Sequence, residues 1–242
     1  VDNVSTFPVP TASPDHPLVA LTREASSLAT EAASAAAAAI TLRKPELFAK
    51  VRACENKLDT IDRDFDDEIV YAVTGTTVAQ GRELLAAFKF IIDLERIGDL
   101  VSSFSSRAEA VIANVETQDI ERFIQMLTML EQMLRLAWDA FEKRELELAI
   151  KVLRADAEID RLRNLVFLRH VGEQRDHDLH ESVQVLFMAH ALERAGDHAK
   201  NLAEEVCHFV SGRTVRHVLR AQDKPYEQLF LDWLRERRSG SL

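Results

Sequence analysis

The chain has 242 residues, 47% of them hydrophobic, which is enough to bury a sizeable core without covalent staples. Its formal net charge of −10 argues against nucleic acid as a partner, because proteins that bind a phosphate backbone neutralise it with Lys and Arg. The two cysteines, Cys54 and Cys207, are too far apart to form a disulfide framework or a zinc motif, so we expect buried or half-buried thiols in a reducing compartment.

Residues 1–17 are rich in Pro, Ser and Thr and are expected to form a flexible leader. This segment lacks the charged and apolar blocks of a signal peptide, and no apolar run approaches the ~18–20 residues needed to span a bilayer. We therefore expect a soluble, cytoplasmic protein.

Beyond Leu18 the chain is nearly free of Gly and Pro, and Ala, Leu, Glu and Arg dominate, which favours helices over strands. Pro17, the segment Gly75–Thr77 and Thr117 are expected to start or cap helices. The pattern predicts six long helices, at about Leu18–Leu42, Pro45–Ala72, Thr77–Asn114, Thr117–Phe141, Lys143–His170 and Leu179–Val210.

The two halves of the chain repeat each other. LERIGD at Leu94–Asp99 recurs as LERAGD at Leu192–Asp197, and the segment that ends at Asp59 resembles the one that ends at Asp160. The sequence therefore predicts an all-α fold of two tandem three-helix bundles joined near Glu116.

The expected division follows from this repeat. The first bundle would span residues 18–115 and the second would span residues 116–220. Residues 221–242 would form a tail with a short helix near Tyr226–Arg237.

Four pairs of acidic residues at i, i+4 spacing fall at matching places in the two units. On a helix, residues at this spacing point the same way. They interrupt apolar stripes, where side-by-side carboxylates are costly unless protons, arginines or a metal compensate them. The pairs are Glu55 and Asp59, Glu95 and Asp99, Asp156 and Asp160, and Glu193 and Asp197.

Two interpretations of the pairs remain open. Oxygen-rich sites bind hard cations and also Mn, Fe or Zn, which predicts divalent or trivalent metal ions. Interhelical salt bridges are the alternative, with Arg96, Arg194 and Arg63 as the candidate cations. The metal interpretation predicts that Glu193 and Asp197 bind metal together with the pair on the preceding helix.

Further polar side chains extend this surface. In the second unit the additional candidate ligands are Ser182, His190, Asn201 and Glu204, and in the first they are Asp62, Asp66, Ser102 and Ser106. Both LER-x-GD copies place a glycine before the second acid, at Gly98 and Gly196. Glycine is unfavourable inside a helix, so a neighbouring helix or a ligand cluster is expected to approach closely there.

Two other functional classes are alternatives. A ferritin-like carboxylate-bridged metal enzyme needs two Glu-x-x-His motifs, and the predicted core helices hold only one, Glu205 and His208. A metal-free helical scaffold is the second alternative. We expect no catalytic residues and no enzyme activity, because no nucleophile motif or phosphate-binding loop is present.

At these residues the chain resembles the PhoU family. LERAGDHAKNLAEEV at Leu192–Val206 is similar to the family's signature, LERIGD is its copy in the first repeat, and VSGRTVRHV at Val210–Val218 resembles the end of the second repeat. The resemblance implies two three-helix bundles that carry multinuclear metal clusters on the eight acids. The metal, Fe, Zn, Mn or Mg, is left open.

The resemblance also implies a role. PhoU proteins are negative regulators that link the ATPase subunit of a phosphate ABC transporter to a membrane sensor histidine kinase, and thereby control transcription of the phosphate-starvation response. We expect the same partners here, contact with the membrane only through them, and a homodimer.

Overall fold

The computed structural model describes residues 16–172 and 179–211, and within these ranges every regular element is helical. The expected leader and tail helix lie outside the described residues. The elements are α1 (Pro17–Leu42), η1 (Pro45–Leu47), α2 (Phe48–Ala72), α3 (Val78–Val111), α4 (Thr117–Lys143), α5 (Leu146–Gly172) and α6 (Leu179–Ser211). The all-α prediction is confirmed.

Local signals mark two of the helix starts. Pro17 is the first residue of α1, where its missing N–H costs nothing. Thr77 and Gln80 form a reciprocal capping box at the start of α3. The expected cap at Thr117 is wrong: Glu116 is the N-cap of α4 and makes no side-chain cap bond, and its carboxylate is paired with Arg169.

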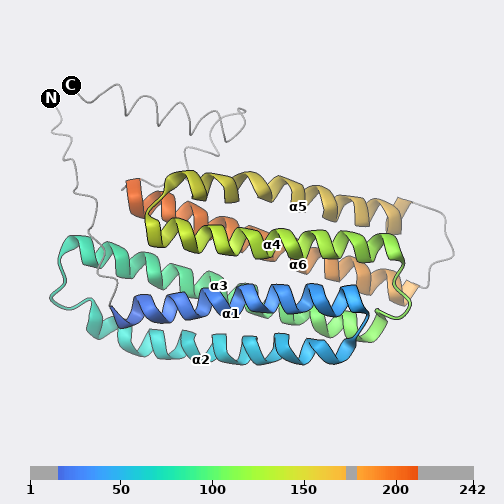
Figure 1. Cartoon of the computed structure of the whole chain (residues 1–242), viewed down its shortest axis with the longest axis horizontal. Coiled ribbons are helices and arrows are strands. Elements are labelled where there is room, and N and C mark those ends of the chain that lie inside the picture. Colours follow the sequence, from blue (N-terminus) through green and yellow to red (C-terminus); the bar gives the residue numbers. More distant parts are fainter. Residues whose placement is uncertain (1–15, 173–178, 212–242) are drawn as a thin grey trace, which may run out of the picture.

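The helices form two layers (Figure 1). In one layer α2, α3, α6 and α5 lie side by side in that order, and α1 and α4 cover them. Helices α1–α3 make one three-helix unit and α4–α6 make the other. The units meet where α3 packs on α6 and α1 packs on α4.

The two glycines of the LER-x-GD repeat, Gly98 and Gly196, have the same structural reason. A Cβ at Gly98 would lie 2.6 Å from Leu58 Cδ1, and one at Gly196 would lie 3.0 Å from Ile159 Cδ1. Each glycine therefore lets a side chain of the preceding helix sit directly against the backbone. This close approach brings the acidic residues of neighbouring helices together.

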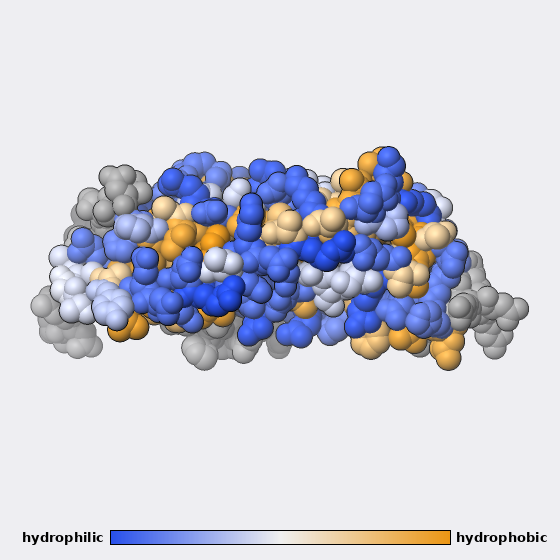
Figure 2. Space-filling view, turned by 90° about the horizontal axis from the view of Figure 1, so that it is seen from below, coloured by the Kyte–Doolittle hydropathy of each residue, from blue (hydrophilic) through white to orange (hydrophobic). Residues whose placement is uncertain are grey.

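The face seen from the α2 side is mainly hydrophilic, with scattered apolar patches (Figure 2). The buried apolar side chains form one core cluster. Both cysteines are buried and free, as expected, and burial raises the pKa of Cys207 to about 12. None of the helices in the described ranges has the length and apolar character of a membrane span.

Candidate metal centre

The first acidic cluster consists of Glu55 and Asp59 from α2 and Glu95 and Asp99 from α3. Glu55, Asp59 and Asp99 each present an oxygen, and these three atoms all lie within 4.8 Å of one another. One turn separates the two acids of each helix, and the close α2–α3 packing at Gly98 brings the helices together. The structure thus brings together residues that the sequence placed in separate helices.

This cluster carries unfavourable charge. Burial raises the pKa of Glu55, and the charges of Asp59 and Asp99 raise it further. Burial and Asp99 likewise raise the pKa of Glu95. Raised values mean that the folded chain disfavours the ionised carboxylates, so a bound cation would relieve a cost that is already present.

One arginine partly compensates the first cluster. Arg96 Nε lies 3.4 Å from Glu95 and its Nη1 lies 3.5 Å from Asp99, but the Arg96 side chain is 58% exposed, so water screens both contacts. The expected partner Arg63 does not neutralise Asp59, since its Nε donates to the backbone carbonyl of that residue. Glu55 has no ion-pair partner among the described residues.

The second acidic cluster consists of Asp156 and Asp160 from α5 and Glu193 and Asp197 from α6. Burial raises the pKa of Asp160, and Asp156 and Asp197 add to the shift, so three of these acids lie close together. Here the protein itself supplies cations. Lys200 is paired with Asp156, and Arg163 lies 3.4 Å from Glu193.

The two clusters therefore differ in charge balance. In the first, three oxygens converge, and an exposed arginine is the only cation beside them in the described part of the chain, a donor set that fits a hard cation. In the second, Lys200 and Arg163 pair with carboxylates that a metal would need as ligands. One buried Glu193 oxygen still lacks a hydrogen bond, although His190 Nδ1 lies 3.2 Å away.

Some of the other candidate ligands lie beside the acidic clusters, and others make contacts elsewhere. His190 and Asp62 lie beside the second and first clusters, respectively. Ser182 instead contacts His170, and Asn201 donates to Asp93 across the α3–α6 contact. Ser106 bonds the backbone of its own helix.

The ferritin-like alternative would need Glu205 as a metal ligand. Glu205 does lie 3.3 Å from His208, but both of its oxygens accept from Lys89 at 2.9 Å. A carboxylate held in this way by a lysine is a poor start for a dimetal site.

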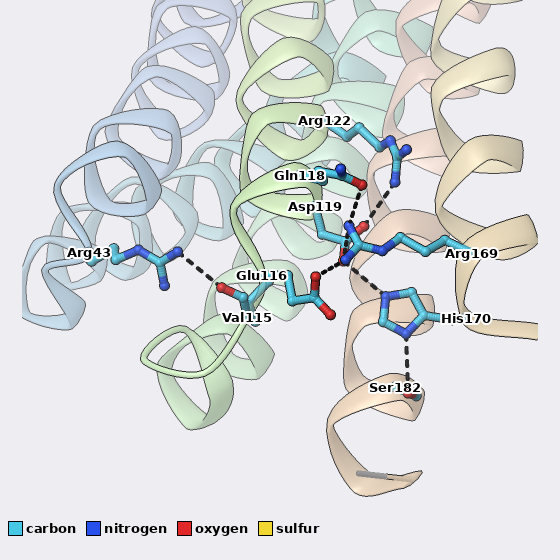
Figure 3. Close-up of polar contacts among 9 residues, drawn as sticks. All are labelled: Arg43, Val115, Glu116, Gln118, Asp119, Arg122, Arg169, His170 and Ser182. Atoms are coloured by element: carbon cyan, nitrogen blue, oxygen red, sulfur yellow. Dashed lines mark hydrogen bonds and ion pairs between the residues drawn. The ribbon is translucent and has the colours of Figure 1, made fainter. Parts of the chain in front are cut away.

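The sequence did not predict a buried polar network around Asp119. Asp119 is 1% exposed and lies 3.0 Å from His170 Nε2 and 3.5 Å from Arg169 (Figure 3). Burial alone would raise the pKa of Asp119, but the His170 hydrogen bond and the charges of Arg169 and Arg122 hold it below its ordinary value. No local pattern predicts such a contact between α4 and the end of α5.

The linker between the units is held from both sides. Arg43, at the end of α1, donates to the carbonyls of Ile112 and Val115 at 2.7 and 3.0 Å. Arg169 from the second unit is paired with Glu116 in the same linker (Figure 3). The join predicted near Glu116 is thus a fixed connection.

Comparison with known proteins identifies a family. A family model described as the PhoU domain matches the chain twice, at residues 22–108 and 123–206. The phosphate-specific transport system accessory protein PhoU homologue of Caulobacter vibrioides is 32% identical over 71% of this chain and 76% of its own length. The corresponding homologue of Pseudomonas aeruginosa is 31% identical over 71% and 73%.

Solved structures agree on the fold. The crystal structure of PhoU from Pseudomonas aeruginosa has a TM-score of 0.73 with 24% identity, and it covers 81% of this chain and 96% of that chain. The phosphate transport system regulatory protein PhoU from Streptococcus pneumoniae has a TM-score of 0.70 with 20% identity and the same coverage. At these identities the likeness supports the architecture alone.

Proposed function

The chain belongs to the PhoU family, and we propose that it is a regulatory accessory protein of a phosphate transport system. The observation that carries the proposal is the double match to the PhoU domain, which covers both three-helix units. The relatives from Pseudomonas aeruginosa and Caulobacter vibrioides are themselves named accessory proteins of phosphate-specific transport.

In this proposal the protein acts by contact rather than by catalysis. It would be a negative regulator that touches the ATPase subunit of a phosphate ABC transporter and a membrane sensor histidine kinase, working as a homodimer. The rigid two-layer bundle supports this role, since it presents long helix surfaces to a partner. We place no catalytic residue in it.

The proposal includes a metal at the first acidic cluster. Glu55, Asp59 and Asp99 would hold a divalent or trivalent cation, with Glu95 beside them. The cation would supply positive charge between α2 and α3 and offset the repulsion that raises the pKa of Glu55. The second cluster stays a predicted site, because Lys200 and Arg163 would have to leave Asp156 and Glu193 for a metal to bind there.

Elemental analysis tests the metal part. Protein purified without chelator is expected to contain Fe, Zn, Mn or Mg, and Asp59→Asn is expected to lower the metal content. Asp67→Asn, an exposed acid on the same helix, serves as the matched control. Unchanged metal content in the Asp59→Asn protein would place the metal elsewhere or remove it from the proposal.

Gene deletion tests the regulatory part. A strain without this protein is expected to express phosphate-starvation genes in high phosphate, and the wild-type gene should restore repression. Normal repression in the deletion strain, with no paralogue present, would reject the regulatory assignment whatever the metal content.

A further inference from the structure

A groove runs along the outer face of α1, on the side covered by neither acidic cluster. It measures about 1130 Å³ and is walled by α4 on one side and by η1 and the start of α2 on the other. In Figure 1, α1 lies between α4 and α2 in this way. Its floor is made of small side chains, among them Ser27, Ser34 and Ala38, and its walls include Trp138 and Leu47.

The groove suits a helix better than a small anion. Its three basic side chains are already paired: Arg23 with Glu142, Lys50 with Glu31 and Arg135 with Glu131, each at 2.8 Å. Small residues on a helix surface let a second helix approach closely. The lining segment of α1, residues 23–38, is about 24 Å long at ~1.5 Å per residue, which matches a helix of several turns.

The chain itself contains a segment with the required pattern. Tyr226, Leu229, Phe230 and Trp233 recur at i, i+3, i+4 and i+7, the spacing of an amphipathic helix that must bury one face. The match to the PhoU domain ends at residue 206, before this segment. The two solved PhoU structures are 96% covered by 81% of this chain, so this chain is the longer one and has residues without counterpart in them.

The end of α6 lies close to the groove. The ring centroid of Phe209 is 5.4 Å from that of Phe141, which is in turn 5.5 Å from Trp138 in the groove wall. Ser211, the last described residue, follows Phe209 by two positions. Residues 212–225 could reach up to ~45 Å at ~3.3 Å per residue, which exceeds the length of the groove.

We propose that residues 226–237 dock as an amphipathic helix in this groove of their own chain. Their length as a helix, about 18 Å at ~1.5 Å per residue, fits the floor of α1. The aromatic side chains would lie over the small residues of α1 beside Trp138. Arg235 and Arg237, near the end of the segment, are complementary in charge to Glu46, which lines the groove.

Tryptophan fluorescence tests the docking, because the chain has only two tryptophans, Trp138 and Trp233. In full-length Trp138→Phe protein, Trp233 is the single reporter. Its quenching constant with acrylamide is expected to be several-fold smaller than in a synthetic peptide of residues 212–242. Adding Ser34→Arg, which fills the exposed floor of the groove, should raise the constant toward that of the peptide.

Controls make the result decisive. Ser103→Arg changes another exposed serine, on α3 outside the groove, and should leave the constant low. Equal quenching in protein and peptide, or shielding that Ser34→Arg does not remove, would overturn the proposal. Light scattering measures whether the protein is a dimer at each concentration. If dilution abolishes both the dimer and the shielding of Trp233, a second copy supplies the segment, and docking within one chain is overturned.

If Trp138→Phe fails to fold, Trp233→Phe protein reports through Trp138, which should become more accessible when residues 221–242 are deleted.

Discussion

Replacing Asp59 by Asn separates the metal interpretation of the first acidic cluster from a purely structural one. Asp59 lies with Glu55 and Asp99 at oxygen separations of no more than 4.8 Å, and no cation among the described residues pairs with its carboxylate in an ion pair. Two unit charges at this distance repel by about 1 kcal/mol in water, and physiological salt roughly halves this value. Because the variant removes two such repulsions, we expect metal-free Asp59→Asn protein to be more stable than wild type by about 1 kcal/mol.

Bound metal should reverse the sign of the stability difference between Asp59→Asn and wild type. A ligand at a hundred times its dissociation constant stabilises the folded state by about 2.7 kcal/mol, and the variant would forgo this gain. With metal, Asp59→Asn is therefore expected to be less stable than wild type by roughly 2 kcal/mol. Urea unfolding of both proteins in chelator and in excess metal measures the four free energies, with Asp67→Asn as the control.

The dependence of folding stability on pH provides a second test of the same cluster. The folded-state pKa of Glu55 lies above its ordinary value of 4.5, so the folded chain binds this proton more tightly than the unfolded chain. Metal-free wild type should then lose stability as the pH rises from 4.5 through the raised value. The advantage of Asp59→Asn should shrink as the pH falls toward 4.5, because the remaining carboxylates become protonated.

One result would refute this reasoning. If Asp59→Asn destabilises the protein equally in chelator and in excess metal, the carboxylate makes a structural bond in the folded chain, and neither repulsion nor metal binding governs its effect.

Three further predictions concern the second unit and the caps. Asp119→Ala should cost about 3 kcal/mol in urea unfolding at pH 7, because it removes a buried carboxylate that contacts Arg122, Arg169 and His170. The contribution of Asp119 should fade as the pH falls below 3.8 toward its lowered pKa, so an unchanged loss at low pH would contradict this account. Glu193→Gln together with Asp197→Asn should lower stability by about 1 kcal/mol in chelator as well as in metal, because Arg163 loses its partner; a loss seen only with metal would instead support a metal site in the second cluster. Thr77→Ala should cost about 1 kcal/mol through loss of the capping box, and Thr77→Ser should restore most of it in a thermal melt.

Much of the fold follows from local patterns. The scarcity of Gly and Pro beyond Leu18 and the apolar stripes predict long helices, and Pro17 and the Thr77 box mark two of their starts. The repeated LER-x-GD segment predicts two equivalent three-helix units, which the structure shows. These features depend on residues near one another in the chain, so the sequence alone contains them.

The cap of α4 shows where such reasoning stops. Thr117 has a good capping side chain, but Glu116 takes the N-cap position, and its carboxylate pairs with Arg169, which is far away in the sequence. The Asp119–His170 contact has the same origin in tertiary packing.

The acidic clusters also combine features that the sequence predicts with features that only tertiary packing decides. Spacing alone placed the acids of each pair on one helix face, and the glycines of LER-x-GD indicated a close neighbour. Two clusters with matching acids nevertheless differ. Lys200 and Arg163 reach Asp156 and Glu193, whereas exposed Arg96 is the only cation that the described ranges place beside the first cluster. A repeat fixes which residue types recur, whereas the cations that reach them come from other turns and other helices, and only tertiary packing decides their distances.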